Sequence, residues 1–355
     1  MTLSVCLIVK DEQEVIVRCL NCASKFADEI VIVDTGSADN TVAMAKKFTD
    51  KVYFFKWCDD FSAARNYAFS KAQCELVMWL DADDVITDEN CEKINRIKNS
   101  FSSYDMAVLP YAASFDGDVP TFVYNRERIF RRSMNFKFSG AVHEAVTPRG
   151  RILYSDAVIY HKKLKENEPM RNLKIIQKLI ASGAKLDARQ KFYYGRELFF
   201  NKMYLESITV LTDFLDGDGW EVNKAEACLN LFDAYVALGD SKKAYGALLR
   251  GFTIAPPSSR ACCIMGDYFL KENNLAGAEF WYNSAIGADK ENSGAFVNRD
   301  YGGFIPYMQL CVVYDRLGNK VKADACNEAA GKLKPYNTNF LNNRKYFENL
   351  GIRGK

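Results

Sequence analysis

The residues best suited to chemistry are three carboxylates, Asp81, Asp83 and Asp84, which directly follow the apolar run 76–80. Like charges 4 Å apart repel by about 1 kcal/mol in water and by about 4 kcal/mol where solvent is partly excluded. Such a cluster therefore needs either a bound cation or a well-solvated turn. Because aspartate is common in turns and at helix N-termini, these residues taken alone slightly favour the turn.

A second polar segment stands at the end of another expected strand. The strand at 29–33 is followed by Asp-Thr-Gly-Ser at 34–37. Gly36 permits a tight turn, and Ser37 or Asp39 can cap the next helix, whose free N–H groups favour an anion. Because two strands of one domain end in acidic residues, we interpret these segments as parts of a ligand-binding site and not as simple turns.

The first half of the chain alternates short apolar runs with helical patterns. We expect strands at 3–9, 29–33, 51–55, 75–80, 104–110 and 152–160, and helices at 12–24, 38–48, 62–72 and 88–99. Continuous apolar strands that alternate with helices indicate βαβ units and a buried, mostly parallel sheet. Ligands of such sheets lie beyond the carboxyl ends of the strands, so both acidic segments would line one crevice.

From about residue 185 the pattern is helical throughout and repeats. One aligned position is held by Gly195, Phe232, Gly266 and Cys311, the position twelve residues later by Ser207, Ala244, Ala278 and Ala323, and the next by Gly219, Pro256, Lys290 and Pro335. The step from Ala244 to Ala278 is 34 residues, the period of tetratricopeptide repeats, although the other steps are 37 and 45. We expect antiparallel helix pairs that approach at the small residues, an insertion loop at 292–303, and a capping helix at 336–352.

The bulk composition excludes several classes of function. A chain of 355 residues with 48% hydrophobic residues indicates about two globular domains. Lys plus Arg (47) nearly balances Asp plus Glu (45), which argues against a nucleic-acid partner or an anionic membrane surface. We find no transmembrane run and no signal peptide, and many cysteines have apolar neighbours, so we expect a cytoplasmic protein with reduced thiols.

Six segments taken together resemble a known family. They are CLIVKDE (6–12), EIVIVDTGSADNT (29–41), WCDDFSAARNYAFSKA (57–72), ELVMWLDADD (75–84), ERIFRRSMNFKFSGAVHEAV (127–146) and IYHKK (159–163). In order and spacing they resemble the family 2 glycosyltransferases of the GT-A fold, in particular the bacterial branch with a C-terminal tetratricopeptide-like domain, which includes peptide S- and O-glycosyltransferases of the glycocin type. The resemblance extends over the whole chain.

The resemblance implies an architecture of two domains. Residues 1–165 would form an α/β GT-A domain with a Rossmann-like, mostly parallel sheet that binds the nucleotide sugar and carries out catalysis. Residues 166–188 would form a linker helix. Residues 189–355 would form an all-α domain of tetratricopeptide-like helical repeats with a C-terminal capping helix.

The resemblance also implies a metal-dependent catalytic centre. Asp81-Ala82-Asp83 matches the Asp-x-Asp motif, whose carboxylates hold Mg²⁺ or Mn²⁺ against the diphosphate of a UDP-sugar. His161 resembles the third protein ligand to the metal, a role that suits a neutral imidazole. Glu144 stands where inverting members place the base that deprotonates the acceptor. A glutamate bonded structurally to one of the nearby arginines remains the alternative.

A larger set of residues is expected to bind the donor. It comprises Val9, Lys10, Glu12, Asp34, Thr35, Gly36, Ser37, Asp60, Arg65, Asn66, Asp81, Ala82 and Arg131. Asp34 would lie near the base or ribose, whereas Thr35 departs from the second acidic residue that many members carry there. A solvated surface role for Arg65 and a structural role for Arg131 remain open.

These residues predict an inverting, metal-dependent glycosyltransferase of class EC 2.4 that moves a sugar from a UDP-sugar to an acceptor. A peptide or protein side chain is the first choice of acceptor, because helical repeats form concave peptide-binding surfaces. A cell-surface glycan or lipid-linked acceptor, and a non-catalytic interaction scaffold, are the alternatives. We expect no nucleic-acid partner, and the resemblance leaves room for a homodimer.

Overall fold

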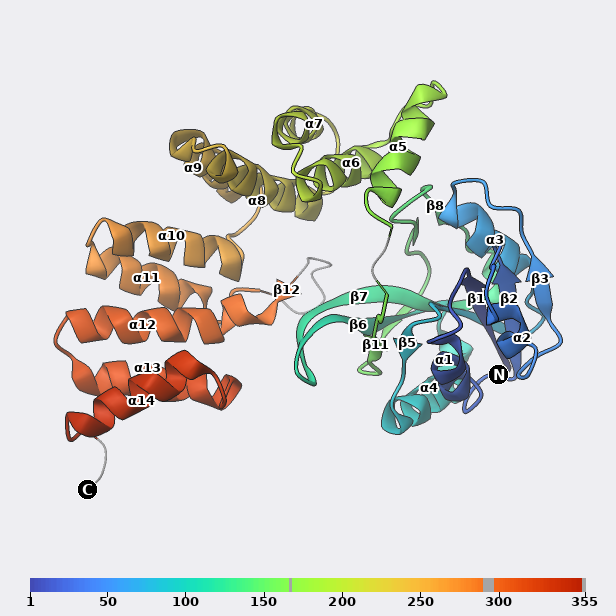
Figure 1. Cartoon of the computed structure of the whole chain (residues 1–355), viewed down its shortest axis with the longest axis horizontal. Coiled ribbons are helices and arrows are strands. Elements are labelled where there is room, and N and C mark those ends of the chain that lie inside the picture. The colour runs from blue at the N-terminus through green and yellow to red at the C-terminus, as the bar shows by residue number, and fades with distance from the viewer. Residues whose placement is uncertain (166–167, 290–296, 353–355) are drawn as a thin grey trace. The chain divides into compact units, whose positions relative to one another are not determined.

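The computed structural model describes residues 1–165, 168–289 and 297–352 (Figure 1). It divides into two compact units, Met1–Met203 and Tyr204–Lys355. The first unit is an α/β structure and the second is built from helices, as the alternating and the purely helical sequence patterns predict.

The first unit is organised around one mixed, mostly parallel sheet. Its strands are β1 (Leu3–Val9), β2 (Glu29–Asp34), β3 (Val52–Phe54), β4 (Leu76–Leu80), β5 (Asp84–Val85), β6 (Met106–Asp116), β7 (Val119–Arg131), β10 (Ile152–Tyr154) and β11 (Ile159–His161). They run in the order β3-β2-β1-β4-β7-β6-β11-β5, and β10 also pairs with β6. Only β7 and β5 run antiparallel to the neighbours with which they pair. A separate ribbon is formed by β8 (Phe138–Ser139) and β9 (Ala145–Val146).

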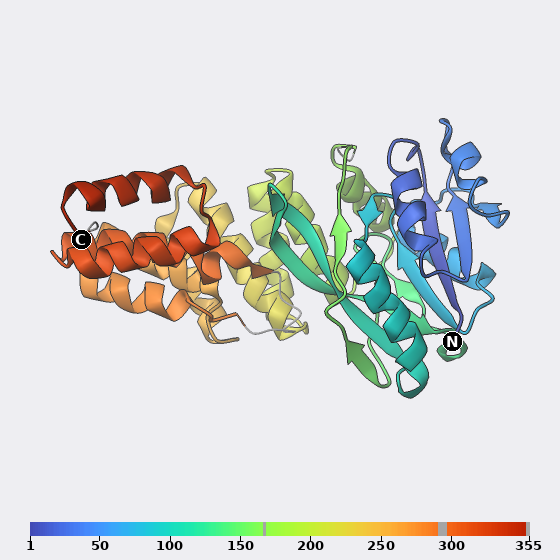
Figure 2. The same cartoon turned by 90° about the horizontal axis from the view of Figure 1, so that it is seen from below.

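Helices cover both faces of this sheet. The helices of this unit are α1 (Ile16–Ala23), α2 (Thr41–Ala45), α3 (Phe61–Lys71), α4 (Asp88–Ser100), α5 (Arg171–Ala181) and α6 (Ala188–Phe200), with 3₁₀ turns η1 (Phe101–Ser103) and η2 (Arg132–Met134). Figure 2 shows α4, in teal, crossing in front of the strands. The apolar residues of α1 and α4 share one core with one face of β1, β2 and β4, and those of α3 share a second core with the other face. Every residue of β4 is buried, as a continuous apolar run predicts.

Three local expectations differ from the structure. The strand expected at 152–160 is broken into β10 and β11, because residues 155–158 leave the sheet. The helix expected at 38–48 spans only Thr41–Ala45 and begins after Asn40, whose side chain makes no capping bond. The long strand β7 was not expected at all.

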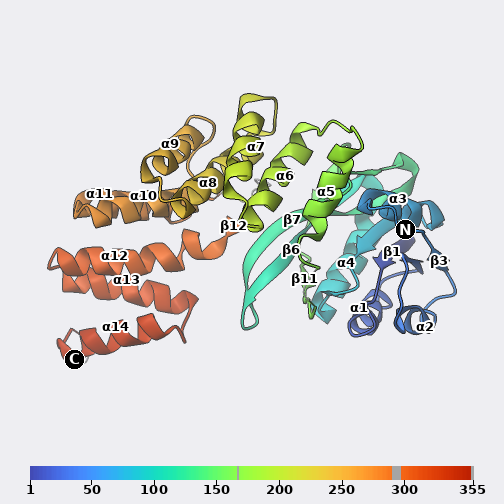
Figure 3. The same cartoon turned by 45° about the horizontal axis from the view of Figure 1, so that its top comes forward.

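The second unit is a series of antiparallel helices (Figure 3). They are α7 (Tyr204–Asp216), α8 (Glu221–Ala237), α9 (Ser241–Phe252), α10 (Ser259–Lys271), α11 (Leu275–Ala285), α12 (Phe304–Arg316), α13 (Lys320–Leu333) and α14 (Thr338–Asn349), with the short elements β12 (Val297–Asn298) and η3 (Arg299–Gly302). Helix α14 covers the last pair, since Phe340 and Phe347 are buried. Lys290 and the beginning of the predicted insertion loop lie outside the described residues.

The repeat positions explain how the paired helices approach each other. The four aligned small residues Ser207, Ala244, Ala278 and Ala323 are all 0% exposed. Each of α9, α11 and α13 begins after an Asp or Asn whose side chain accepts a hydrogen bond from the N–H three residues later. The capping residue follows a residue in the left-handed conformation, Gly239, Asn273 or Gly318. The same tight turn thus recurs in each pair.

None of the helices in the described parts of the chain is both long and apolar enough to cross a membrane.

Candidate active site

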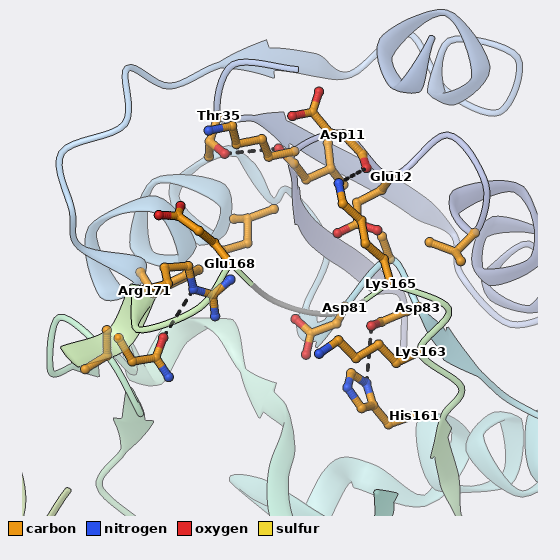
Figure 4. A pocket seen from close by; sticks show the side chains of 18 of the residues that line it. Asp11, Glu12, Thr35, Asp81, Asp83, His161, Lys163, Lys165, Glu168 and Arg171 are labelled. Atoms are coloured by element: carbon orange, nitrogen blue, oxygen red, sulfur yellow. Dashed lines mark hydrogen bonds and ion pairs between the residues drawn. The ribbon is translucent and has the colours of Figure 1, made fainter. Parts of the chain in front are cut away.

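A pocket of ≈ 1330 Å³ opens beyond the carboxyl ends of the parallel strands in the first unit (Figure 4). Its walls are formed by the loop after β1 (8–15), the end of β4 (81–83), the loop 142–144 and two described segments at and after the end of β11 (161–165 and 168–178). Thr35 and Asp39 from the second acidic segment also line it. The parallel topology therefore brings the two acidic strand ends to one pocket.

Three side chains at the edge of this pocket offer a set of metal ligands, and two of them, Asp83 and His161, line it. Asp83, Asp84 and His161 place one ligand atom each within 4.8 Å of one another. His161 Nδ1 lies 3.2 Å from an oxygen of Asp83 and 3.4 Å from an oxygen of Asp84. The antiparallel pairing of β5 with β11 sets His161 opposite Asp84. Carboxylate oxygens and an imidazole nitrogen suit a divalent cation such as Mn²⁺, so the donor set fits such an ion.

The two carboxylates of this cluster differ in their surroundings. Asp84 is 0% exposed and accepts hydrogen bonds from the Tyr111 hydroxyl (2.9 Å), the Asp81 N–H (3.0 Å) and an Arg128 Nη (3.2 Å). Its oxygens are therefore already engaged, whereas Asp83 lines the pocket. Asp83 is therefore the more accessible of the two carboxylates, whereas the buried Asp84 contacts His161 from within the fold.

The local charge favours a cation at this position. Burial lowers the pKa of His161, but its hydrogen bonds to Asp83 and Asp84 outweigh burial and raise that pKa to about 10. Burial and the nearby carboxylate of Asp83 raise the pKa of Glu12 to about 7. A bound divalent cation would replace the imidazolium proton, since metal ligands bind in their deprotonated form.

Arg65 connects Asp81 to Glu144. Its Nη2 lies 2.8 Å from Asp81 Oδ1 and its Nε lies 2.6 Å from Glu144 Oε1. The guanidinium is only 6% exposed and stacks on the ring of Trp79, 4.3 Å from its centroid. Burial raises the pKa of Asp81, but Arg65 and then Arg128 hold that pKa well below its usual range. Asp81, expected as a metal ligand, thus has Arg65 as its ion-pair partner and is not one of the three clustered residues.

The loop that carries Glu144 is fixed by the residue before it. His143 has a positive φ of 51°, an unusual conformation for a non-glycine residue. Its ring stacks on Tyr193 of α6 with centroids 4.3 Å apart, and its Nε2 lies 2.6 Å from Glu197 Oε1. Asn172 of α5 donates to the same Glu197 oxygen at 3.1 Å. Helices α5 and α6 therefore hold the backbone that presents Glu144.

The residues predicted to bind the donor fall into two groups. Those that line the pocket are Val9, Lys10, Glu12, Thr35, Arg65, Asp81 and Ala82. Those that are not among the lining residues are Asp34, Gly36, Ser37, Asp60, Asn66 and Arg131.

Several members of the second group have structural roles in this fold. Asp34 accepts from the N–H groups of Gly36 and Ser37 and so shapes their turn. Asp60 caps α3 by accepting from the N–H of Ala63. The Asn66 amide exchanges two hydrogen bonds with the backbone of Phe138, which ties α3 to β8.

Arg131 is the clearest correction. It donates to the carbonyl oxygens of Phe101, Ser102 and Tyr104 and lies far along the sheet from the pocket. The reason is the direction of β7, which runs antiparallel to β4 and places Arg131 opposite Leu76, at the start of β4. The pocket lies beyond the other end of β4, and there Arg126 of β7 lines it.

Sequence reasoning missed two further parts of the pocket. The β6–β7 hairpin contributes Tyr111, Tyr124 and Arg126. The segment after β11 contributes the cations Lys163, Lys165, Arg171, Lys174 and Lys178. The helical spacing of 171, 174 and 178 was a readable signal of one basic helix face. No comparable signal marked the hairpin, because its strand β7 alternates poorly.

The fold and the site together define a mixed α/β domain with a candidate divalent-metal centre beyond the carboxyl ends of its parallel strands. Residues 4–148 match the family described as "Glycosyl transferase family 2". This match covers the N-terminal part of the chain, and the helical repeats follow it.

Comparisons with individual proteins show partial likenesses. The chain is 35% identical over 144 residues to a "TPR repeat-containing protein" of Synechococcus elongatus, covering 40% of this chain and 35% of that protein. It is 29% identical over 211 residues to the "SPbeta prophage-derived glycosyltransferase SunS" of Bacillus subtilis, covering 56% of this chain and 49% of the relative. The chain thus spans about half the length, or less, of these curated relatives. Among solved structures, S. aureus TarS 1–349 in complex with UDP-GlcNAc is similar at a TM-score of 0.42 and 18% identity, covering 70% of this chain and 90% of that chain.

Proposed function

We propose that this protein is an inverting, metal-dependent glycosyltransferase that transfers a sugar from a UDP-sugar to an acceptor nucleophile. The observation that carries the proposal is that the candidate metal ligands and the candidate base line one and the same pocket. Asp83 and His161 stand on one wall, and Glu144 stands on another. Arg65 joins the Glu144 wall to Asp81, which neighbours the metal-ligand candidates.

The roles follow from the chemistry of each side chain. Asp83 and His161 would hold Mg²⁺ or Mn²⁺, which would offset the charge of the departing diphosphate when bound. Lys163 and Lys165 line the same side and supply further positive charge. Glu144 would accept the proton of the acceptor, a contribution of about 10² to 10⁴-fold in rate. Arg65 would hold the Glu144 carboxylate in position for this step through their ion pair.

The acceptor is the finer part of the proposal. A peptide or protein side chain is favoured because helical repeats suit peptide binding. The relative SunS, which is 29% identical over 211 residues, is itself a glycosyltransferase. A glycan or lipid-linked acceptor is the second candidate. A non-catalytic scaffold is a weaker reading, since it gives no reason for the Asp83–His161 cluster and the Arg65–Glu144 pair to share one pocket.

The proposal is tested by measuring UDP release from UDP-glucose and UDP-N-acetylglucosamine with Mn²⁺ or with EDTA. We expect turnover that requires the metal. Glu144→Gln should leave UDP affinity nearly unchanged while it lowers kcat by about 10² to 10⁴-fold, because the base acts on the acceptor and not on the donor.

Two results would contradict these assignments. An unchanged rate in Glu144→Gln would remove this residue as the base. The absence of metal-dependent turnover with every nucleotide sugar tried would favour the scaffold.

A further inference from the structure

Helix α5 presents a basic face to the pocket on the side of the proposed base. The residues of α5 that line the pocket are Arg171, Asn172, Lys174, Ile175 and Lys178. Positions 171, 174, 175 and 178 follow helical spacing, so they share one face of the helix. Figure 4 shows Arg171 on the opposite side of Asp81 from Asp83 and His161. This basic face is therefore separate from the candidate metal centre.

Arg171 is the least compensated cation of this face. Its Nε donates to Asn172 Oδ1 at 3.2 Å, and its guanidinium lies 4.9 Å from the centroid of the Phe61 ring. Within the described parts of the chain, no carboxylate lies at ion-pair distance from it. Burial lowers the pKa of Arg171, and the more distant charges of Glu144 and Glu197 only partly oppose this effect. A half-buried guanidinium in this state favours an anionic ligand.

The two lysines of the same face have carboxylate partners that a ligand can displace. Lys174 lies 2.9 Å from Glu168, and Lys178 lies 2.7 Å from Asp59. The side chains of both pairs are substantially exposed. Exposed ion pairs contribute about 0–1 kcal/mol, so an incoming anion can replace either carboxylate at little cost.

An apolar surface lies beside these cations. Ile175 belongs to a small cluster with Val142, against which Trp57 and Phe61 pack. The Trp57 and Phe61 rings meet edge to face with centroids 4.8 Å apart, and both residues line the pocket. Val142 stands two residues before Glu144. The basic face and the aromatic pair thus lie on the acceptor side of the pocket.

We propose that Arg171, Lys174 and Lys178 form an anion subsite that binds a carboxylate of an acidic acceptor peptide, while Trp57, Phe61 and Ile175 receive a neighbouring apolar side chain. This inference rests on the proposed function and adds the chemical class of the acceptor. It assigns Arg171 to the acceptor rather than to the donor diphosphate. The preferred acceptor has an acidic and an apolar residue next to its nucleophile.

The test is a binding measurement that needs no turnover. Two fluorescein-labelled peptides of equal length carry the same central Ser, Cys and Phe residues, and are flanked by Asp in one and by Lys in the other. Their affinities for the full-length protein are measured by fluorescence polarisation with UDP and Mn²⁺ present. We expect the acidic peptide to bind at least about tenfold more tightly, which corresponds to one charge-assisted hydrogen bond.

Variants assign the effect to α5. Arg171→Ala should weaken binding of the acidic peptide about tenfold and leave the affinity for UDP, measured by calorimetry, unchanged. Lys185→Ala removes a positive charge from an exposed position outside the pocket and should change neither affinity. Should Arg171→Ala fail to fold, the Lys174→Ala/Lys178→Ala double variant serves instead, with an expected loss of about threefold or more.

Several results would overturn the inference. Equal affinities for the two peptides, or an acidic peptide that binds Arg171→Ala as tightly as the wild type, would remove the subsite. An equal loss of UDP affinity in Arg171→Ala would assign the residue to the donor. Binding of a poly(glycerol phosphate) oligomer but of neither peptide would point to a phosphate-bearing polymer. A failure of the proposed function would look different. A wild-type protein that binds the acidic peptide selectively but transfers no sugar would contradict the proposed function and support the subsite.

Discussion

At the scale of single residues, adjacent carboxylates differ because their side chains lie in different environments. Asp84 is fully buried and bonded to Arg128, which is itself 0% exposed. Asp83 lines the pocket and faces His161. One position along the chain therefore separates a residue that holds the fold together from one that is available to a ligand.

Substitution of these two residues should have opposite consequences. Asp83→Asn should abolish Mn²⁺ binding in calorimetry, because it removes a proposed ligand. It should leave the free energy of unfolding nearly unchanged, because Asp83 lines the pocket and is not part of the core. Asp84→Asn should lower the free energy of unfolding by about 3–5 kcal/mol in urea, since it leaves the charge of Arg128 buried without its partner. Full Mn²⁺ affinity in Asp83→Asn would refute its role as a ligand.

At the scale of elements, the loop that carries Glu144 depends on helix α6. Burial raises the pKa of Glu197, but its hydrogen bonds to His143 and Asn172 outweigh burial and lower that pKa below its usual value. A carboxyl with a depressed folded-state pKa stabilises the protein above its unfolded-state pKa of about 4.3, and the contribution is lost as pH falls through the lower folded-state value.

This linkage predicts a pH-dependent effect of Glu197→Gln. The variant should lose about 1–3 kcal/mol of unfolding free energy at pH 7. The difference from the wild type should begin to shrink as the pH falls below the unfolded-state pKa of about 4.3, and it should vanish below the depressed folded-state pKa. Urea titrations at several pH values measure this difference in unfolding free energy. Glu206→Gln, on the exposed face of α7, is the control. A difference that does not depend on pH would exclude the ionised carboxylate as the cause.

The close approach of paired helices gives a second prediction for an element. A Cβ built on Gly266 of α10 would lie 2.5 Å from the Tyr282 ring of α11, whereas a Cβ on Gly246 of α9 would meet nothing within 4 Å. Gly266→Ala should therefore destabilise the protein by about 1–3 kcal/mol. Gly246→Ala should stabilise it by about 0.5–1 kcal/mol, because alanine is the better helix former. Equal effects in urea denaturation would contradict the packing argument.

An element could be predicted where its sequence has a clear hydrophobic pattern. Strands β1, β2 and β4 were predictable because their residues are apolar and buried on both faces. Strand β7 was not, because its sequence is polar, contains Pro120 and pairs through a bulged register with β6. Without β7, the sequence does not reveal that this strand runs antiparallel to β4. The expectation that Arg131 lies at the pocket is wrong for this reason. The parallel topology alone predicts that the acidic segments after β2 and β4 lie close together. The ion pairs of Arg65 with Asp81 and Glu144 could be seen only in the structure.

At the scale of the whole molecule, the candidate active site belongs to one of the two compact units. Every described residue that lines the pocket falls between Ile8 and Lys178, within the unit Met1–Met203. This unit also contains the complete sheet core around β1, β2 and β4. The proposed donor and metal ligands therefore do not require residues of the helical repeats.

A chain ending at Met203 should consequently fold and bind the donor nucleotide. We expect its affinity for UDP with Mn²⁺, measured by calorimetry, to lie within about twofold of that of the full chain, because energetic contributions from separate regions are nearly additive. Asp83→Asn in the shortened chain is the control and should abolish the binding. If the shortened chain folds, as judged by circular dichroism, yet does not bind UDP, then the repeats supply part of the donor site and the assignment of the pocket to the first unit is wrong.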